Sequence, residues 1–143
     1  MRSAFAEVAF RREANGLGLP VDVVSAGTNA RPGKSADPRA TTRAQVHGFS
    51  LESHRARLLD SRLIESADII VAMDYLNAAR ILTRFPDAAP RLVMLGHFRD
   101  REHDGLEISD PYDQPESLAM ACFDRIADSV AALARTLDRR HGP

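Results

Sequence analysis

The sequence predicts an α/β domain in which a doubly wound parallel sheet carries helices on both faces. Short apolar or β-branched runs alternate with amphipathic helical segments along the chain, which is the pattern of such a sheet. Neither an internal repeat nor a low-complexity linker interrupts this alternation. The 143 residues fit the usual range of about 100 to 200 residues per domain, so we expect residues 1–143 to form a single domain.

The first predicted helix runs from about Ser3 to Arg12, where apolar residues recur at helical spacing. Asn15-Gly16 supplies a left-handed stop for this helix. The next segment, Val21–Ala26, is short and rich in β-branched residues, which is typical of a buried strand. A Gly- and Pro-rich loop follows over residues 27–36.

Two further helices are indicated by their capping residues. Asp37 precedes a proline at the first position of the second helix, which ends about three turns later at His47-Gly48. Asp60 and Ser61 can cap a short helix. That helix leads into the apolar run 68–74, which we expect to be a strand buried on both faces.

The remaining elements complete the alternation. Residues 75–85 predict a helix that stops before Pro86, and residues 91–96 predict another strand. The last helix, from about Glu116 to Arg140, should pack along the sheet through one apolar stripe. The stripe consists of Leu118, Cys122, Phe123, Ile126, Val130, Leu133 and Leu137. In that position Cys122 is expected to be a buried, inert thiol.

Composition limits the classes of function. The formal net charge of -1 gives no electrostatic reason to expect a nucleic acid or an anionic membrane as partner. No run of about 18 apolar residues and no secretory signal is present, so we expect a cytoplasmic protein. A single cysteine allows neither an internal disulfide nor a multi-cysteine zinc site.

Six short strings stand in a fixed order along nearly the whole chain. They are Arg2-Ser3 before Ala6-Glu7, Ser25-Ala26-Gly27-Thr28, Asp37-Pro38-Arg39-Ala40, His54-Arg55-Ala56-Arg57, Ala72-Met73-Asp74 and Asp110-Pro111-Tyr112. In this order and spacing they resemble the low-molecular-weight protein tyrosine phosphatases. The resemblance implies hydrolysis of phosphotyrosine or other aryl phosphate monoesters through a phosphocysteine, without a metal or an organic cofactor.

The family's nucleophile lies in a phosphate-binding loop (P-loop) of cysteine, five residues, arginine and serine between the first strand and the first helix. Arg2 and Ser3 match the last two residues of that loop. We therefore expect Met1 to be an internal methionine of a longer protein, and the chain as printed to be inactive and poorly folded without its central first strand. Cys122, far along the chain, cannot substitute for the loop cysteine.

The resemblance also assigns roles to five residues. Arg2 would clamp the phosphate, and Ser3 would bind substrate and lower the pKa of the nucleophilic thiol. Asp110 would be the general acid, and Tyr112 would form a wall that stacks on an aromatic ring. His54 would brace the phosphate loop through Ser3.

The residues taken alone leave plainer interpretations open. Asp110 begins an Asp-Pro dipeptide, which often forms a turn or a helix cap. Ser3 could simply cap the first helix, and Arg2 and His54 could face solvent.

The sequence predicts the substrate and the partner less directly than the reaction. The family often has a second aromatic residue after the one matched by Tyr112, whereas this chain has Asp113. The change weakens the expected preference for aryl groups and is expected to disfavour highly acidic peptides. Asp113-Gln114-Pro115 resembles the bacterial branch associated with capsule or exopolysaccharide tyrosine kinases. The expected partner is therefore a phosphotyrosine protein, such as a bacterial tyrosine kinase, or a small aryl phosphate.

Two other functions fit the same resemblance. One is a non-catalytic relative that binds phosphotyrosine or a partner protein. The other is an arsenate reductase of the same fold that uses an external thiol, because a relay of several cysteines is excluded by the single Cys122. Whether phosphoarginine is accepted is also left open by the sequence.

Overall fold

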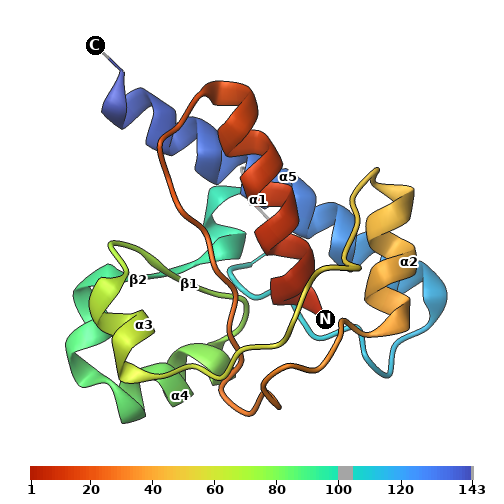
Figure 1. Cartoon of the computed structure of the whole chain (residues 1–143), viewed down its shortest axis with the longest axis horizontal. Helices are drawn as coiled ribbons and strands as arrows, with labels where there is room; N and C mark the ends of the chain where they lie inside the picture. The colour runs from red at the N-terminus through yellow and green to blue at the C-terminus, as the bar shows by residue number, and fades with distance from the viewer. Residues whose placement is uncertain (100–104, 143) are drawn as a thin grey trace.

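The long helices α1 and α5 lie side by side, and the remaining elements are arranged around them (Figure 1). The computed structural model describes residues 1–99 and 105–142. Its elements in chain order are α1 Arg2–Leu17, α2 Pro38–Val46, α3 Ser61–Ser66, β1 Ile70–Ala72, α4 Tyr75–Arg84, the 3-10 helix η1 Pro86–Arg91, β2 Leu92–Met94, the 3-10 helix η2 Leu95–Phe98 and α5 Glu116–His141.

Aspartate side chains cap three of the helices. Asp37 accepts a hydrogen bond from the backbone N–H of Arg39 at the start of α2, and Asp60 accepts one from Leu63 at the start of α3. Both caps confirm the predicted starts of these helices. The end of α1 differs from the prediction: the helix continues to Leu17 and stops at Gly18, whose φ of 66° is left-handed and suits a residue without a Cβ atom.

The α/β class is confirmed by a parallel pair of strands joined through α4. Ile70 pairs with Leu92, and Ala72 pairs with Met94. The expectation that the first of these strands is buried on both faces is wrong, because the side chain of Val71 is 38% exposed. The Val71 side chain therefore points to a face of the strand that the described residues leave partly uncovered.

The predicted strand Val21–Ala26 is not a strand. The segment is extended, but among the described residues no neighbouring strand pairs with it; a single parallel bridge, Gly27 to Leu58, follows it. The N–H of Ser25 instead bonds to the Glu7 carboxylate. Val24 is 54% exposed, so the expected burial is also wrong.

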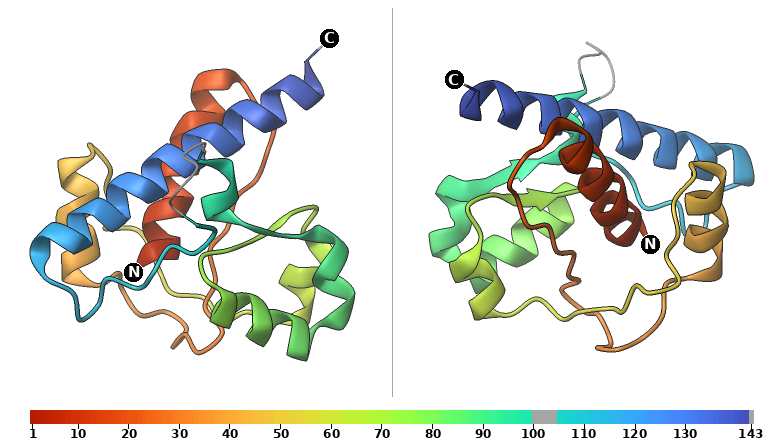
Figure 2. Two further views of the ribbon diagram at one scale, coloured as in Figure 1. Left: turned by 180° about the vertical axis from the view of Figure 1, so that it is seen from behind. Right: turned by 45° about the horizontal axis from the view of Figure 1, so that its top comes forward.

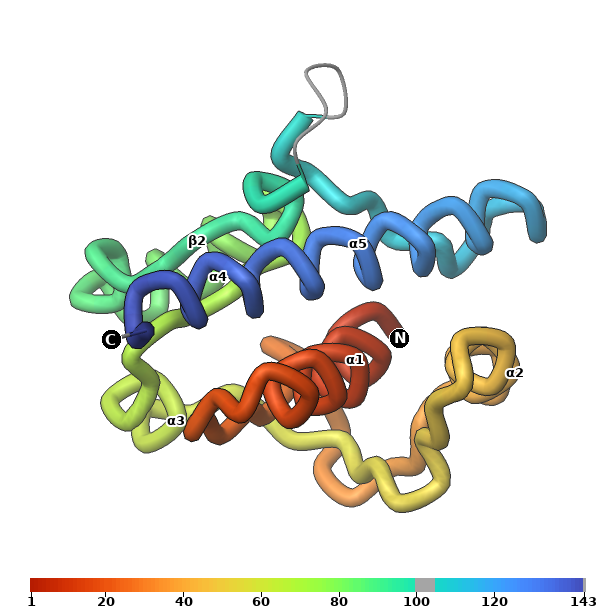
Figure 3. The backbone as a smooth tube through the Cα atoms, turned by 90° about the horizontal axis from the view of Figure 1, so that it is seen from above, coloured from red at the N-terminus to blue at the C-terminus, as the bar shows by residue number. Residues whose placement is uncertain are grey.

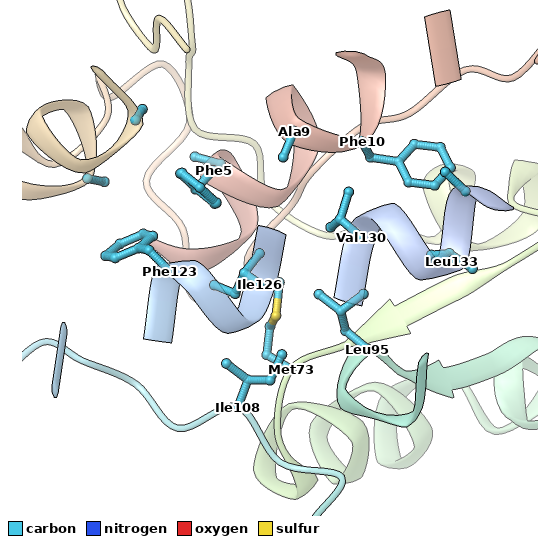
Figure 4. Close-up of a cluster of buried hydrophobic side chains, with 14 of the residues drawn as sticks. Phe5, Ala9, Phe10, Met73, Leu95, Ile108, Phe123, Ile126, Val130 and Leu133 are labelled. Atoms are coloured by element: carbon cyan, nitrogen blue, oxygen red, sulfur yellow. The ribbon is translucent and has the colours of Figure 1, made fainter. Parts of the chain in front are cut away.

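The main core lies between α1 and α5 (Figure 4). The rings of Phe5 and Phe123 meet edge to face with centroids 5.0 Å apart. Met73 and Ile108 close this core on the sheet side, where the N–H of Ile108 donates to the carbonyl oxygen of Met73 at 2.7 Å. That bond holds the segment leading into α5 against the end of β1.

A smaller core lies beneath α3 and α4. It consists of Ile64, Ile70, Ala72, Ile81 and Ala88. Viewed from above, α5 runs past α1, α4 and β2, and α2 lies on the opposite side of α1 from α3 (Figure 3). The start of α1 lies close to the segment that leads into α5, as both views of Figure 2 show.

Two members of the predicted stripe on the last helix depart from it. Leu118 is exposed, and Cys122 is only half-buried. Leu118 lies in the first turn of α5, whereas Cys122 packs against the edge of the main core. The rest of the helix packs on α1 as the spacing predicts.

Candidate active site

The first turn of α1 places the guanidinium of Arg2 between two carboxylates. Arg2 is only 9% exposed, so the interpretation as a solvated terminal residue is wrong. Its Nη2 atom lies 2.8 Å from Asp74 Oδ2 and 3.7 Å from Asp110 Oδ2. Its Nη1 atom donates to the carbonyl oxygen of Ile108. Arg2, Asp74 and Asp110 are called the Arg2 cluster below.

Asp74 is the partner of Arg2 that sequence reasoning missed. It follows β1 directly, and its Oδ1 atom caps α4 by accepting from the N–H of Asn77 at 2.7 Å. Its other oxygen is thereby left to pair with Arg2. The available signal was its position at the carboxyl end of a parallel strand, where functional side chains of open α/β sheets gather.

Asp110 is both a turn residue and a member of the cluster. Its Oδ1 atom accepts from the N–H of Tyr112 at 3.1 Å, as the plain turn interpretation predicts. Its Oδ2 atom faces Arg2, and its side chain is 59% exposed. The carboxyl is therefore held in place at one oxygen and open to solvent for proton exchange.

Tyr112 stands beside Asp110 and is 54% exposed. The guanidinium carbon of Arg39 lies 4.2 Å from the centre of the Tyr112 ring. Arg39 Nη1 also donates to the carbonyl oxygen of Tyr112 at 2.7 Å. Arg39 of α2 therefore holds the exposed Tyr112 ring from one side.

A hollow of about 150 Å³ opens next to these residues. Met1 and Pro111 line it on the side of the Arg2 cluster, and Arg39 and Arg43 line it from α2. Arg43 is paired with Glu116 of α5. The concave surface is therefore bordered by both the start of α1 and the turn that carries Asp110.

Ser3 and His54 are not joined in the way that the resemblance implies. Ser3 lies inside α1, whose N-cap residue is Met1, so the capping interpretation of Ser3 is wrong. The ring of His54 is largely buried, which excludes the solvent-facing interpretation, and its Nδ1 atom lies 3.8 Å from Glu7 Oε2. Among the described residues no hydrogen bond connects His54 with Ser3.

Glu7 is the second residue that sequence reasoning missed. Its carboxylate accepts from the backbone N–H of Ser25 at 2.9 Å, from the Ser25 hydroxyl and from Arg11 at 2.7 Å. Partial burial acts to raise the pKa of Glu7, but the hydrogen bonds from Ser25 and Arg11 outweigh it and lower the pKa. Glu7 therefore connects α1 to the extended segment before Gly27 and to His54.

Cys122 lies near the cluster but is a poor nucleophile. Its Sγ atom donates to the carbonyl oxygen of Ser109 at 3.4 Å. Burial raises the pKa of the thiol to about 11, although Arg2 acts in the opposite direction. At neutral pH the group is a thiol, whereas nucleophilic attack requires the thiolate.

The cluster holds one positive and two negative formal charges. A phosphate monoester brings about -1.5 to -2 further charge near neutral pH. The start of α1 adds partial positive charge from its free N–H groups.

The part of the chain that the structure describes shows neither a cluster of metal ligands nor a membrane-spanning helix. Residues 1–99 and 105–142 contain no group of three or more His, Cys, Asp or Glu side chains suited to a metal ion. Within the same residues, none of the helices is both long enough and apolar enough to cross a membrane.

Comparison with known proteins decides the family. The family model described as low molecular weight phosphotyrosine protein phosphatase matches residues 1–142. The chain belongs to this family. Because the match includes both ends of the Arg2 cluster, Arg2 and Asp110, it covers the candidate site as well as the core.

Individual relatives show how the likeness extends. The chain is 33% identical over 120 residues to the low molecular weight protein-tyrosine-phosphatase Wzb of Salmonella typhi, covering 84% of this chain and 78% of Wzb. It is 31% identical to a probable low molecular weight protein-tyrosine-phosphatase EpsP of Ralstonia solanacearum, over 96% of this chain and 83% of EpsP. The solved structure of the YwlE arginine phosphatase from Geobacillus stearothermophilus is 28% identical, with a TM-score of 0.84, over 97% of this chain and 86% of YwlE.

Proposed function

We propose that this family member hydrolyses phosphotyrosine or other aryl phosphate monoesters through a phosphocysteine intermediate. The observation that carries the proposal is the approach of the Asp110 carboxyl to the buried guanidinium of Arg2 at the start of α1. In this proposal Asp110 is the proton donor and Arg2, beside it, is the cation that binds the phosphate. Tyr112, exposed next to Asp110, offers a ring on which the aryl group can stack.

By the family pattern the nucleophile would be a cysteine in the loop that ends at Arg2-Ser3, and that pattern would place it upstream of Met1. Its thiolate attacks phosphorus, so that the S–P bond forms while the bond from phosphorus to the aryl oxygen breaks. Asp110 gives its proton to that oxygen. Water then attacks phosphorus, Asp110 takes the water proton, and the thiolate leaves.

Arg2 would bind the equatorial phosphate oxygens together with the N–H groups of that loop. Its planar guanidinium can donate two parallel hydrogen bonds, which an ammonium group cannot do. In the structure the same guanidinium is held by Asp74 and by the carbonyl of Ile108. Asp74 would thus orient the clamp before substrate arrives.

The substrate we propose is a phosphotyrosine protein, such as an autophosphorylated bacterial tyrosine kinase. Similarity to the protein-tyrosine-phosphatases Wzb and EpsP supports it. Similarity to YwlE, which is named an arginine phosphatase, makes phosphoarginine the competing substrate. The exposed Tyr112 ring offers a stacking surface to an aryl group, and the assay below decides between the two substrates.

The test compares two proteins. The first is the 143-residue chain, and the second carries the in-frame codons that precede Met1. Both are assayed with 4-nitrophenyl phosphate, a phosphotyrosine peptide and a phosphoarginine peptide. We expect turnover of the two aryl esters by the longer protein, and no turnover by the chain that begins at Met1.

The other outcomes identify the alternatives. Binding of phosphotyrosine without turnover by the longer protein would make it a non-catalytic relative. Arsenate-dependent consumption of an external thiol, without aryl phosphatase activity, would make it an arsenate reductase. Turnover of the phosphoarginine peptide alone would overturn the proposed substrate but keep the proposed chemistry.

A further inference from the structure

Arg39 joins two parts of the molecule that are distant in sequence. It is the second residue of α2, and its contacts reach the turn after Asp110. Arg39 belongs to the string Asp37-Pro38-Arg39-Ala40, to which the family resemblance assigns no role in the reaction. Its contacts give it one.

The Arg39 side chain is hydrogen-bonded to Asp37. The carboxylate of Asp37 accepts from the backbone N–H of Arg39 at 2.8 Å, from Nε at 3.3 Å and from Nη2 at 3.4 Å. Partial burial of Asp37 acts to raise its pKa, but these hydrogen bonds from Arg39 lower it, so the carboxylate stays charged. The same carboxylate that caps α2 therefore fixes the direction of the Arg39 side chain.

The free end of Arg39 fixes Tyr112 in two ways. Nη1 donates to the Tyr112 carbonyl oxygen at 2.7 Å, while the guanidinium carbon lies 4.2 Å above the ring. A planar cation over an aromatic face is an attractive arrangement. One face of the ring is covered by Arg39, and the tyrosine is still 54% exposed.

We propose that Arg39 is a specificity-determining residue for the aryl group of the substrate, acting by holding Tyr112. The inference rests on the proposed function. Since Asp113 replaces the second aromatic residue common in the family, a single ring must provide the wall, and a ring that turns freely would stack poorly. Arg39 supplies the support that a neighbouring aromatic side chain would otherwise give.

The first experiment does not depend on catalysis. It uses the longer protein, with Tyr75 and any tyrosine or tryptophan upstream of Met1 replaced by Phe. Because residues 1–143 contain two tyrosines and no tryptophan, Tyr112 is then the only source of intrinsic fluorescence. In that background we expect Arg39→Ala to raise the quenching constant for acrylamide about twofold, because the second ring face becomes accessible. Arg39→Lys should act in the same direction, since an ammonium group cannot lie flat on the ring.

Arg84→Ala is the matched control. Arg84 is also an exposed arginine that bonds a backbone carbonyl, that of Leu59 at 3.3 Å, and lies over a ring, that of Phe85 at 5.1 Å. It should leave Tyr112 quenching unchanged. Far-UV circular dichroism checks that each variant is folded, and Arg39→Lys keeps a cation beside Asp37 if Arg39→Ala does not fold.

The second experiment uses the longer protein described above. We expect Arg39→Ala to lower kcat/KM for 4-nitrophenyl phosphate about fivefold and to change that for an alkyl phosphate by less than about twofold. Unchanged quenching, or an equal loss for both esters, would overturn the proposal while leaving the proposed function intact. Absence of aryl phosphatase activity in the parent protein would refute the proposed function, and with it the specificity role, whatever the quenching shows.

Discussion

At the scale of single residues, the site is organised around one buried cation, the guanidinium of Arg2. Arg2 has two carboxylates and a carbonyl oxygen around it, and the shorter of its ion pairs is with Asp74. Asp74 is largely buried, whereas Asp110 is mostly exposed. The two acids therefore differ in environment, and we propose that Asp74 holds the guanidinium while Asp110 exchanges the proton.

Replacement of Asp74 tests this division. Asp74→Asn keeps an oxygen to cap α4 but removes the charge that pairs with Arg2. We expect a loss of about 1 to 3 kcal/mol in the free energy of unfolding, and weaker inhibition of the longer protein by inorganic phosphate. Urea unfolding and phosphate inhibition measure the two effects.

Asp60→Asn is the control for the Asp74 variant. Asp60 caps α3 in the same way, through the N–H of Leu63 at 2.9 Å, and makes no ion pair among the described residues. Its replacement should cost less than that of Asp74. Equal losses in the two variants would mean that Asp74 acts only as a cap.

Cys122 gives a prediction about pH. Burial raises its pKa from 9.0 to about 11, so between these values the unfolded chain loses a proton that the folded chain retains. The contribution of the thiol to stability is therefore complete below about pH 9 and is lost as the pH rises towards 11. Urea midpoints of Cys122→Ala should fall less steeply over this range than those of the parent; parallel curves would contradict the assignment.

The same variant tests the nucleophile. Because the thiol of Cys122 is protonated at neutral pH, Cys122→Ala in the longer protein should retain turnover of 4-nitrophenyl phosphate. Abolished turnover with the fold intact would place Cys122 in the chemistry.

At the scale of elements, the helices and both strands of the observed sheet could be predicted, whereas one further predicted strand, Val21–Ala26, did not form. Capping residues such as Asp37 and Asp60 act within one turn, so their effect is readable from neighbouring residues. The segment 21–26 has the composition of a strand, but a strand also needs a partner, and composition does not say which partner is present. Among the candidate site residues, the resemblance supplied Arg2, Asp110 and Tyr112 but no partner for Arg2.

The connection from α1 to the extended segment gives the prediction at this scale. Glu7 has a lowered pKa, so its stabilising effect is present above its ordinary value of 4.5 and is lost as the pH falls below it. Glu7→Gln should therefore reduce stability by about 1 to 2 kcal/mol at pH 7 and by progressively less in acid. Urea unfolding between pH 7 and about pH 4 measures this.

Glu13 provides the control for Glu7. It lies on the same helix and makes no ion pair or hydrogen bond among the described residues. Glu13→Gln should leave stability nearly unchanged across this range. A pH-independent loss in Glu7→Gln would show that packing, and not the charged hydrogen bonds, is what the variant removes.

At the scale of the whole molecule, one edge of the sheet has no partner strand among the described residues. Strand β1 pairs with β2 along one edge, and no strand of the described residues pairs with its other edge. Val71 on that strand and Val24 on the extended segment are both exposed. Exposed apolar side chains next to free backbone N–H and C=O groups favour association with another strand.

As a proposal that follows the family pattern, residues encoded in frame before Met1 would supply that strand. The longer protein should then unfold in a sharp thermal transition, while the chain that begins at Met1 should aggregate or melt broadly. Each unpaired backbone group costs about 1 to 3 kcal/mol, against about 5 to 15 kcal/mol for the stability of a whole domain. Calorimetry of both proteins measures the difference, and identical melting curves would count against the predicted strand.

The most direct measurement on the catalytic account is the turnover of Asp110→Asn in the longer protein, taken together with its inhibition by inorganic phosphate. Loss of the proton donor should lower kcat for a phosphotyrosine peptide by about 10² or more, while the phosphate inhibition constant stays near that of the parent. An unchanged kcat would remove Asp110 from the reaction and contradict the role assigned to the Arg2 cluster.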